Sequence, residues 1–276
     1  MSSPDLTLCY CTNMWSHHQA PISRELVRLL GDGRFKLCLF DPVCEEKRKI
    51  GYAGTAPEHK WIAGPPHFSG DLERLTRLVC DAEVAVLGSC PQEVRAARAA
   101  TGKLTFVMSE RMWKTPFHWW RMLNPRFARG IRTFKDMANR DNVHALAIGA
   151  YAAADVRRIG AYGDRVWTFA YFAELASRPP QPRPRDKLRI LWVGRMLNWK
   201  RVDLLLKAVA RVCRHPAFGR VDIVGVGPEY NGLLKLARKL GLGDQCRFHE
   251  PVAADHVREL MRQADVYVLP SNRYEG

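Results

Sequence analysis

The chain has 276 residues, of which 47% are hydrophobic and 26% charged, which excludes a disordered chain and allows one large or two small globular domains. Its 43 Lys and Arg residues against 28 Asp and Glu residues give a net charge of +15, which favours nucleic acid, anionic lipid or phosphorylated small molecules as ligands. The first residues lack the basic start and apolar core of a signal peptide, and no apolar run approaches the ~20 residues of a membrane-spanning helix.

The eight cysteines are scattered along the chain, and no two of them form a CxxC pair. Buried, reduced thiols are therefore their simplest interpretation, and we expect neither a disulfide framework nor a metal site. Reduced thiols indicate a reducing compartment, so a cytoplasmic protein is expected.

In the first part of the chain, short β-rich runs alternate with amphipathic helical patterns. We expect strands at 6–12, 35–41, 83–89, 103–110, 142–149 and 165–172, and helices at 20–30 and 71–82. Several of these strands are apolar on both faces, as buried parallel strands are. The alternation predicts an α/β fold with a parallel sheet that carries helices on both faces.

The segment SRPPQPRPRDK, residues 177–187, is the best linker in the chain, because its prolines and charges exclude a helix or a central strand. It separates a domain at 1–176 from a domain at 188–276, in which the alternation restarts. There we expect strands at 188–194, 221–227, 246–250 and 265–271. The expected helices are at 201–214, 228–241 and 254–263, the last with Asp255 as its N-cap. Ligands bind beyond the carboxyl ends of parallel strands, so two such domains would place a cleft between them.

The loop GRMLNWK carries the first candidate ligand-binding residues. Gly194 ends a strand, Arg195 follows it, and Lys200 stands at the start of a helix. A tight glycine turn, two cations and a helix N-terminus suit a diphosphate. Solvated surface cations are the alternative.

Two further loops follow predicted strands. In VGVGPE, Gly225 and Gly227 would let backbone approach a ligand closely, although the pattern is short of a complete GxGxxG and suits a plain strand-to-helix turn equally well. In PSNRYEG, Glu275 lies just past a strand end, where an ordinary loop glutamate is the default interpretation.

Taken together, residues 188–276 resemble the nucleotide-sugar half of family 4 glycosyltransferases, which have the GT-B fold. The resemblance covers about a third of the chain and is carried by VGRMLNWKRVDLLLKAVA, VDIVGVGPEYNGLLKLARKLGL, VRELMRQADVYVLPS and YEG, in that order. It implies two Rossmann-like domains that face each other across a cleft, with the acceptor on the first and the nucleotide sugar on the second.

The resemblance also implies roles for individual residues. Arg195 and Lys200 match the basic pair that holds the donor diphosphate, which would neutralise the departing nucleotide without a metal or another cofactor. Gly194 and Gly227 belong to the same donor-binding loops. Glu275 matches the first glutamate of a paired-glutamate motif and would contact the hydroxyls of the transferred sugar.

The loop before Glu275 departs from the family pattern. Three residues separate Ser271 from Glu275, where many members have two, so this loop is expected to be slightly longer. The second glutamate of the motif, which usually holds the nucleotide ribose, would fall beyond Gly276. The resemblance therefore predicts an incomplete second domain and a chain that is a fragment or a truncated transferase.

The first domain offers fewer specific signals for the acceptor side. His17 and His18 follow the first strand, and either could bind acceptor or phosphate, or could be an exposed loop residue. Glu110 ends another strand and would point into the cleft as an acceptor-side carboxylate. Arg111 could pair with it, in which case the two would form a structural ion pair.

Residues 111–137 form the most basic and aromatic stretch of the chain. Trp beside Arg suits a membrane interface, and anionic lipid adds roughly 1 kcal/mol per nearby cation. We therefore expect this stretch to dock on the inner face of the membrane, near a lipid-linked acceptor. A core-packing helix with a solvated basic face is the alternative.

The resulting hypothesis is a retaining glycosyltransferase that moves a sugar from a nucleotide-sugar donor to a hydroxyl of a lipid-linked or saccharide acceptor, in surface polysaccharide or glycolipid synthesis. The alternative is a non-catalytic fragment that binds a nucleotide sugar or phosphate but lacks the second glutamate. No nucleic-acid recognition motif accompanies the positive charge, so nucleic acid is not an expected partner.

Overall fold

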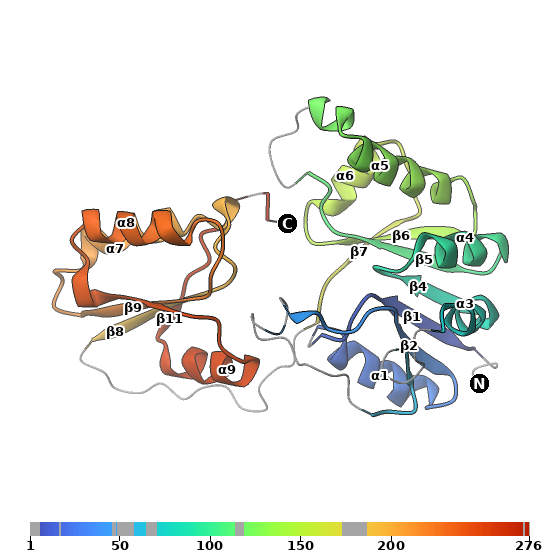
Figure 1. Cartoon of the computed structure of the whole chain (residues 1–276), viewed down its shortest axis with the longest axis horizontal. Helices are drawn as coiled ribbons and strands as arrows, with labels where there is room; N and C mark the ends of the chain where they lie inside the picture. Colours follow the sequence, from blue (N-terminus) through green and yellow to red (C-terminus); the bar gives the residue numbers. More distant parts are fainter. Residues whose placement is uncertain are drawn as a thin grey trace. The chain divides into compact units, whose positions relative to one another are not determined.

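The computed structural model describes residues 6–16, 18–45, 48, 58–64, 71–113, 119–172, 187–272 and 274–275. The chain divides into two compact units (Figure 1). The N-terminal unit contains Met1–Cys44 and Ala53–Glu174, and the C-terminal unit contains Glu45–Tyr52 and Leu175–Glu275. The predicted linker at 177–187 lies outside the described residues except for Lys187.

The N-terminal unit is built on a seven-stranded sheet with the order β3-β2-β1-β4-β5-β6-β7, and its neighbouring strands are parallel. The strands are β1 Leu8–Thr12, β2 Phe35–Leu39, β3 Ile62–Ala63, β4 Val84–Leu87, β5 Thr105–Ser109, β6 Val143–Ile148 and β7 Val166–Phe169. The order reverses between β1 and β4, as in doubly wound α/β folds, and the predicted parallel sheet is confirmed.

Helices cover both faces of this sheet. They are α1 Ala20–Leu30, α3 Leu72–Asp81, α4 Gln92–Ala100, η1 Trp119–Leu123, α5 Pro125–Ala138 and α6 Ala152–Arg158. Tyr10 of β1 faces the core that α1 covers, whereas Cys9 and Cys11 face the core under α3 and α4. These two cysteines therefore point to the same side as buried free thiols, in agreement with their spacing in the sequence.

A fully buried arginine ties three elements of the N-terminal unit together. Arg98 of α4 donates hydrogen bonds to the carbonyls of Val79, Cys80, Ala82, Glu83 and Leu104 and to the hydroxyl of Thr105. These acceptors lie at the end of α3, in the turn that follows it and at the start of β5. Because each would be hard to satisfy in the core without a donor, Arg98 replaces water as the partner of this turn.

The C-terminal unit contains a four-stranded parallel sheet with the order β10-β9-β8-β11. Its elements are β8 Leu188–Val193, η2 Asn198–Lys200, α7 Val202–Val212, β9 Phe218–Val224, α8 Tyr230–Lys239, η3 Gly243–Gln245, β10 Cys246–His249, α9 Ala254–Gln263 and β11 Val266–Tyr267. Helices α7 and α8 cover one face around the buried Trp192, and α9 lies on the other face (Figure 1).

The structure corrects three details of the predicted elements. The two-residue strand β3 was not predicted, because it is too short to show a periodic pattern. Strand β9 begins at Phe218 rather than at residue 221. Helix α9 begins at Ala254 with Ala253 in the capping position, so Asp255 is not the N-cap and instead forms an ion pair with Arg258 within the helix. Among the described residues, no helix has the length and apolar character needed to cross a bilayer.

Candidate functional site

The loops after β8 and β9 lie against each other at the carboxyl edge of the C-terminal sheet. The backbone N–H of Gly194 donates to the carbonyl of Val224 at 3.0 Å, and that of Met196 donates to Val226 at 2.9 Å. Strand pairing thus continues past the ends of both strands. It fixes the segment that carries Arg195 and leads into η2 and α7.

The glycines of the second loop are explained by this backbone contact. A Cβ atom on Gly227 would lie 2.4 Å from the carbonyl oxygen of Met196, and one on Gly225, which has φ +124°, would lie 2.1 Å from that of Gly194. Only glycine fits at such distances. The donor-binding role of Gly194 and Gly227 stays a prediction, since loop packing alone already requires glycine at position 227.

Two of the predicted site residues meet at this edge. The ammonium of Lys200, at the end of η2, forms an ion pair with Oε1 of Glu275, and their side chains are 19% and 30% exposed. The second carboxylate oxygen of Glu275, Oε2, is buried and has no hydrogen-bond partner among the described residues. The arrangement leaves one hydrogen-bond acceptor of a charge-balanced pair unsatisfied.

Asn272 holds the loop that carries Glu275 beside Lys200. Its backbone N–H donates to the carbonyl of Trp199 at 2.9 Å, which anchors the loop beside η2. Its side-chain oxygen accepts from the N–H of Tyr274 at 3.0 Å, and its carbonyl accepts from the N–H of Glu275 at 3.0 Å. Asn272 thus closes the turn that leads to Glu275. Sequence reasoning missed this residue, although Asn at the first position of a turn is its signal.

Arg195 is exposed, and no ion pair of its guanidinium is found within the described part of the chain. The structure therefore places it in the same loop as Lys200 but does not join it to Glu275. A cation in this position can bind an incoming anion without first breaking an ion pair.

The start of α7 is fixed by a separate ion pair. Arg201 has φ +51° and binds both carboxylate oxygens of Asp203, at 2.9 and 3.0 Å. The Arg201 guanidinium holds the pKa of Asp203 at about 2, well below its usual range. Because Lys200 directly precedes Arg201, the ion pair of Arg201 with Asp203 also orients the backbone of Lys200.

Tyr267 of β11 also lies next to Glu275. Its hydroxyl donates to the carbonyl of Val193 at 3.3 Å. Burial raises the pKa of Tyr267, and the negative charge of Glu275 raises it further. No pattern in the sequence pointed to this tyrosine.

On the N-terminal unit, the structure joins two predicted acceptor-side residues through a third. Glu110, after β5, accepts a hydrogen bond from the hydroxyl of Tyr171 at 2.7 Å. The ring of Tyr171 stacks on His18, which follows β1, with 5.2 Å between the ring centroids. Tyr171 follows β7 and was not predicted as a site residue, and His17 lies outside the described residues. Three strand ends thus contribute to one polar aromatic cluster.

The expected pairing of Arg111 with Glu110 is wrong. Arg111 instead pairs with Oδ2 of Asp155 at 3.3 Å, and this carboxylate also accepts the N–H groups of Met112 and Trp113. Asp155 is 2% exposed and belongs to α6. A buried carboxylate that finds both a guanidinium and two backbone donors outcompetes the exposed Glu110 as a partner.

The basic-aromatic stretch has a buried and an exposed side. Trp113 and Ile131 are buried, so part of the stretch packs in the core. Leu123 is 71% exposed at the end of η1, and the neighbouring side chains of Arg126 and Arg129 on α5 are exposed as well. Residues 114–118 and the side chains of Trp119 and Trp120 lie outside the description. Within the described residues, no cluster of His, Cys, Asp or Glu could hold a metal ion.

Comparison with protein families and curated proteins finds sequence similarity for the C-terminal unit. Residues 174–276 match the family model of glycosyl transferases group 1. The chain is 39% identical over 106 residues to a D-inositol 3-phosphate glycosyltransferase of Streptomyces griseus subsp. griseus, which is 35% of this chain and 22% of that protein. It is 32% identical over 103 residues to the phosphatidylinositol N-acetylglucosaminyltransferase gpi3 subunit of Schizosaccharomyces pombe, which is 37% of this chain and 22% of that protein. The chain thus spans about a fifth of the length of these two relatives.

Solved structures match the whole chain by fold. HepE of Anabaena in complex with UDP superposes with a TM-score of 0.61 at 14% identity and covers 96% of this chain and 74% of that one. The lipopolysaccharide outer core galactosyltransferase WaaB gives a TM-score of 0.58 at 14% identity, with the same coverage. The expected α/β fold with two parallel, Rossmann-like sheets, resembling that of GT-B glycosyltransferases, is confirmed.

Proposed function

We propose that this chain, whose residues 174–276 match the glycosyl transferases group 1 family, acts in transfer of a sugar from a nucleotide-sugar donor to a hydroxyl acceptor. The observation that carries the proposal is the ion pair of Lys200 and Glu275 at the carboxyl edge of the second sheet, with Arg195 in the same loop. A ligand that carries both a diphosphate and hydroxyls matches this combination of cations and an unsatisfied carboxylate oxygen.

In the proposed reaction, Arg195 and Lys200 bind the donor diphosphate and stabilise the charge that grows on it as it leaves. Glu275 keeps Lys200 oriented and accepts a hydrogen bond from a sugar hydroxyl at Oε2. The acceptor oxygen bonds to the anomeric carbon while the bond from that carbon to the diphosphate oxygen breaks. The acceptor proton passes to the departing diphosphate. Attack from the face that the diphosphate leaves retains the anomeric configuration, and the two cations suit a reaction that needs no metal.

The acceptor is proposed to bind at the cluster of His18, Tyr171 and Glu110. The exposed ring of Tyr171 offers a flat surface to a sugar ring, and Glu110 accepts hydrogen bonds from hydroxyls. A lipid-linked or saccharide acceptor of surface polysaccharide or glycolipid synthesis fits these groups. Leu123 with the nearby arginines would hold the protein to the inner face of the membrane.

Binding and turnover of nucleotide sugars test the proposal directly. Calorimetry with UDP and other nucleoside diphosphates is combined with an assay of diphosphate release, for the wild type, Arg195→Ala and Lys200→Ala. We expect each substitution to lower binding or rate at least about tenfold, or about 1.4 kcal/mol. Lys235→Ala, which removes an exposed lysine of α8, is the control and should change neither.

Two outcomes would count against the proposal in different ways. Unchanged binding and rate in Lys200→Ala would refute the diphosphate site. Tight binding that depends on Lys200, without release or transfer with any donor, would instead identify a nucleotide-sugar binding module.

A further inference from the structure

Arg189 of β8 and Arg220 of β9 lie opposite each other in the C-terminal sheet, in the same register. A register shift produces this pair, because Leu188 is opposite Phe218 while Arg189 is opposite Arg220, so that Gly219 is the extra residue. A Cβ atom on Gly219 would lie 2.7 Å from the carbonyl oxygen of Leu188, so the bulge requires glycine. The bulge places two like charges side by side, which is unfavourable unless something compensates them.

Among the described residues that line this region, Asp222 is the one carboxylate, and both of its oxygens already have a partner. Asp222 is 7% exposed, and its Oδ2 accepts from Nε of Arg220 at 2.8 Å while its Oδ1 lies 2.8 Å from Nε2 of His249. Asp265 accepts the backbone N–H of Arg189 at 2.7 Å and does not neutralise its guanidinium. Across the described residues, the structure contains no ion pair of the Arg189 side chain.

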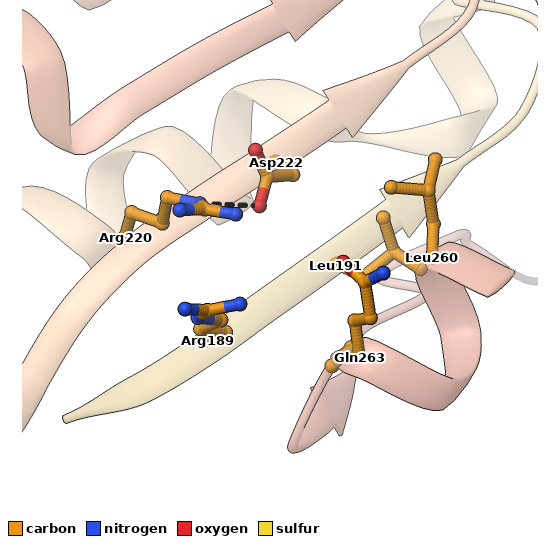
Figure 2. Close-up of a pocket in the computed structure, with 7 residues that line it drawn as sticks. Arg189, Leu191, Arg220, Asp222, Leu260 and Gln263 are labelled. Atoms are coloured by element: carbon orange, nitrogen blue, oxygen red, sulfur yellow. Dashed lines mark hydrogen bonds and ion pairs between the residues drawn. The ribbon is translucent and has the colours of Figure 1, made fainter. Parts of the chain in front are cut away.

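Both arginines line a small hollow between the sheet and the end of α9. Figure 2 shows Arg189 and Arg220 on neighbouring strands, the ion pair of Arg220 with Asp222, and Leu191, Leu260 and Gln263 on the α9 side.

We infer that this hollow is a binding site for a phosphate-sized oxyanion, either inorganic phosphate or the phosphate of a monoester, held between Arg189 and Arg220. Guanidinium groups bind such anions through paired N–H donors. An anion here would neutralise Arg189, beside Arg220, whose charge Asp222 already balances. Arg189 precedes Gly194 by five residues of extended chain, or roughly 16 Å at about 3.3 Å per residue. The site is therefore separate from the loops proposed to bind the donor diphosphate.

Titration of the whole chain with inorganic phosphate at constant ionic strength tests this inference, with glycerol phosphate as a second ligand to separate a free ion from an ester. The variant is Arg189→Gln, which keeps Asp222 and its partners intact. Arg211→Gln, an exposed arginine at the end of α7, is the matched control. We expect saturable binding by the wild type and the control, and about tenfold weaker binding by Arg189→Gln. Phosphate should raise the melting temperature of the wild type and of Arg211→Gln only.

Equal binding of phosphate by Arg189→Gln and the wild type, or no saturable binding by either, would overturn the inference. So would a loss of phosphate binding in Lys200→Ala rather than in Arg189→Gln, because the ion would then occupy the donor loops. Binding of UDP by Arg189→Gln should equal that of the wild type, so this test and that of the proposed function fail independently.

Discussion

Lys200 and Glu275 hold each other at the carboxyl edge of the second sheet, although 75 residues separate them in the chain. Lys200 lies at the end of η2, and Glu275 lies in the loop after β11. The backbone N–H of Asn272 donates to the carbonyl of Trp199 and connects this loop to η2. The pair neutralises itself in the free protein. A bound diphosphate would therefore share Lys200 with Glu275 rather than find an isolated cation.

The pKa of Tyr267 depends on the charge of Glu275. Because burial and the Glu275 carboxylate both raise the pKa of Tyr267, Glu275→Gln should lower that pKa while leaving it above the ordinary value. NMR titration of labelled tyrosines above pH 9 or so measures it. Glu229→Gln is the control, because Glu229 is not among the groups that shift the pKa of Tyr267. A Tyr267 pKa that does not move in Glu275→Gln would contradict the placement of the carboxylate.

Two glycine substitutions should have opposite effects on stability. Gly227→Ala forces a Cβ atom against the backbone of Met196, so we expect a loss of about 1–3 kcal/mol in the free energy of unfolding. Gly232→Ala, within α8, meets no atom within 4 Å and should stabilise by about 0.5–1 kcal/mol. Urea denaturation measures both, and a neutral Gly227→Ala would show that the loops separate easily.

Arg98 should be among the most sensitive residues of the N-terminal unit. Arg98→Met leaves buried carbonyls of the α3–β4 turn without donors, so the free energy of unfolding should fall by at least about 3 kcal/mol. Arg77→Met removes an arginine that is 66% exposed and should change it by less than about 0.5 kcal/mol. Similar unfolding midpoints for the two variants would contradict the role of Arg98.

Asp203 should contribute stability that depends on pH. Its folded pKa of about 2 lies below that of the unfolded chain, so the contribution is fully present above about pH 4 and is lost as the pH falls toward 2. Because about a third of the side chain is exposed, we expect Asp203→Asn to cost at most about 1 kcal/mol at neutral pH. Melting curves from pH 7 to about pH 2 should show the difference from the wild type shrinking to zero, whereas Asp244→Asn should follow the wild type throughout.

Leu123 should contribute to membrane binding if η1 docks on lipid. Leu123→Asp places a carboxylate beside exposed arginines and should abolish flotation with anionic liposomes at low salt. Leu29→Asp, at a position on α1 that is 62% exposed, is the matched control and should float as the wild type does. Absence of wild-type flotation would refute membrane docking through this stretch.

The parallel sheets were predictable because their strands are apolar on both faces and alternate with amphipathic helices. The assignment of Lys200 and Glu275 to one donor site was implied only by the resemblance of the loops to a known family, and their ion pair was not predicted. Tyr171 could not be predicted, since its partner Glu110 lies 61 residues away in the sequence. The acceptors of Arg98 are nearer in the chain, but they meet it only through the way α3, α4 and β5 are stacked. Asp255 was wrongly predicted as a cap because composition does not reveal which residue first leaves helical backbone geometry.

The turn closed by Asn272 decides where the Glu275 carboxylate lies in space, more than the number of residues before it does. Glu275 reaches Lys200 because Asn272 is attached to Trp199, so the number of residues after Ser271 matters less than that attachment. Search patterns that fix the gap between the serine and the glutamate would discard such a chain. Patterns that permit a variable gap, or templates that compare the cation and the carboxylate in space, would retrieve it.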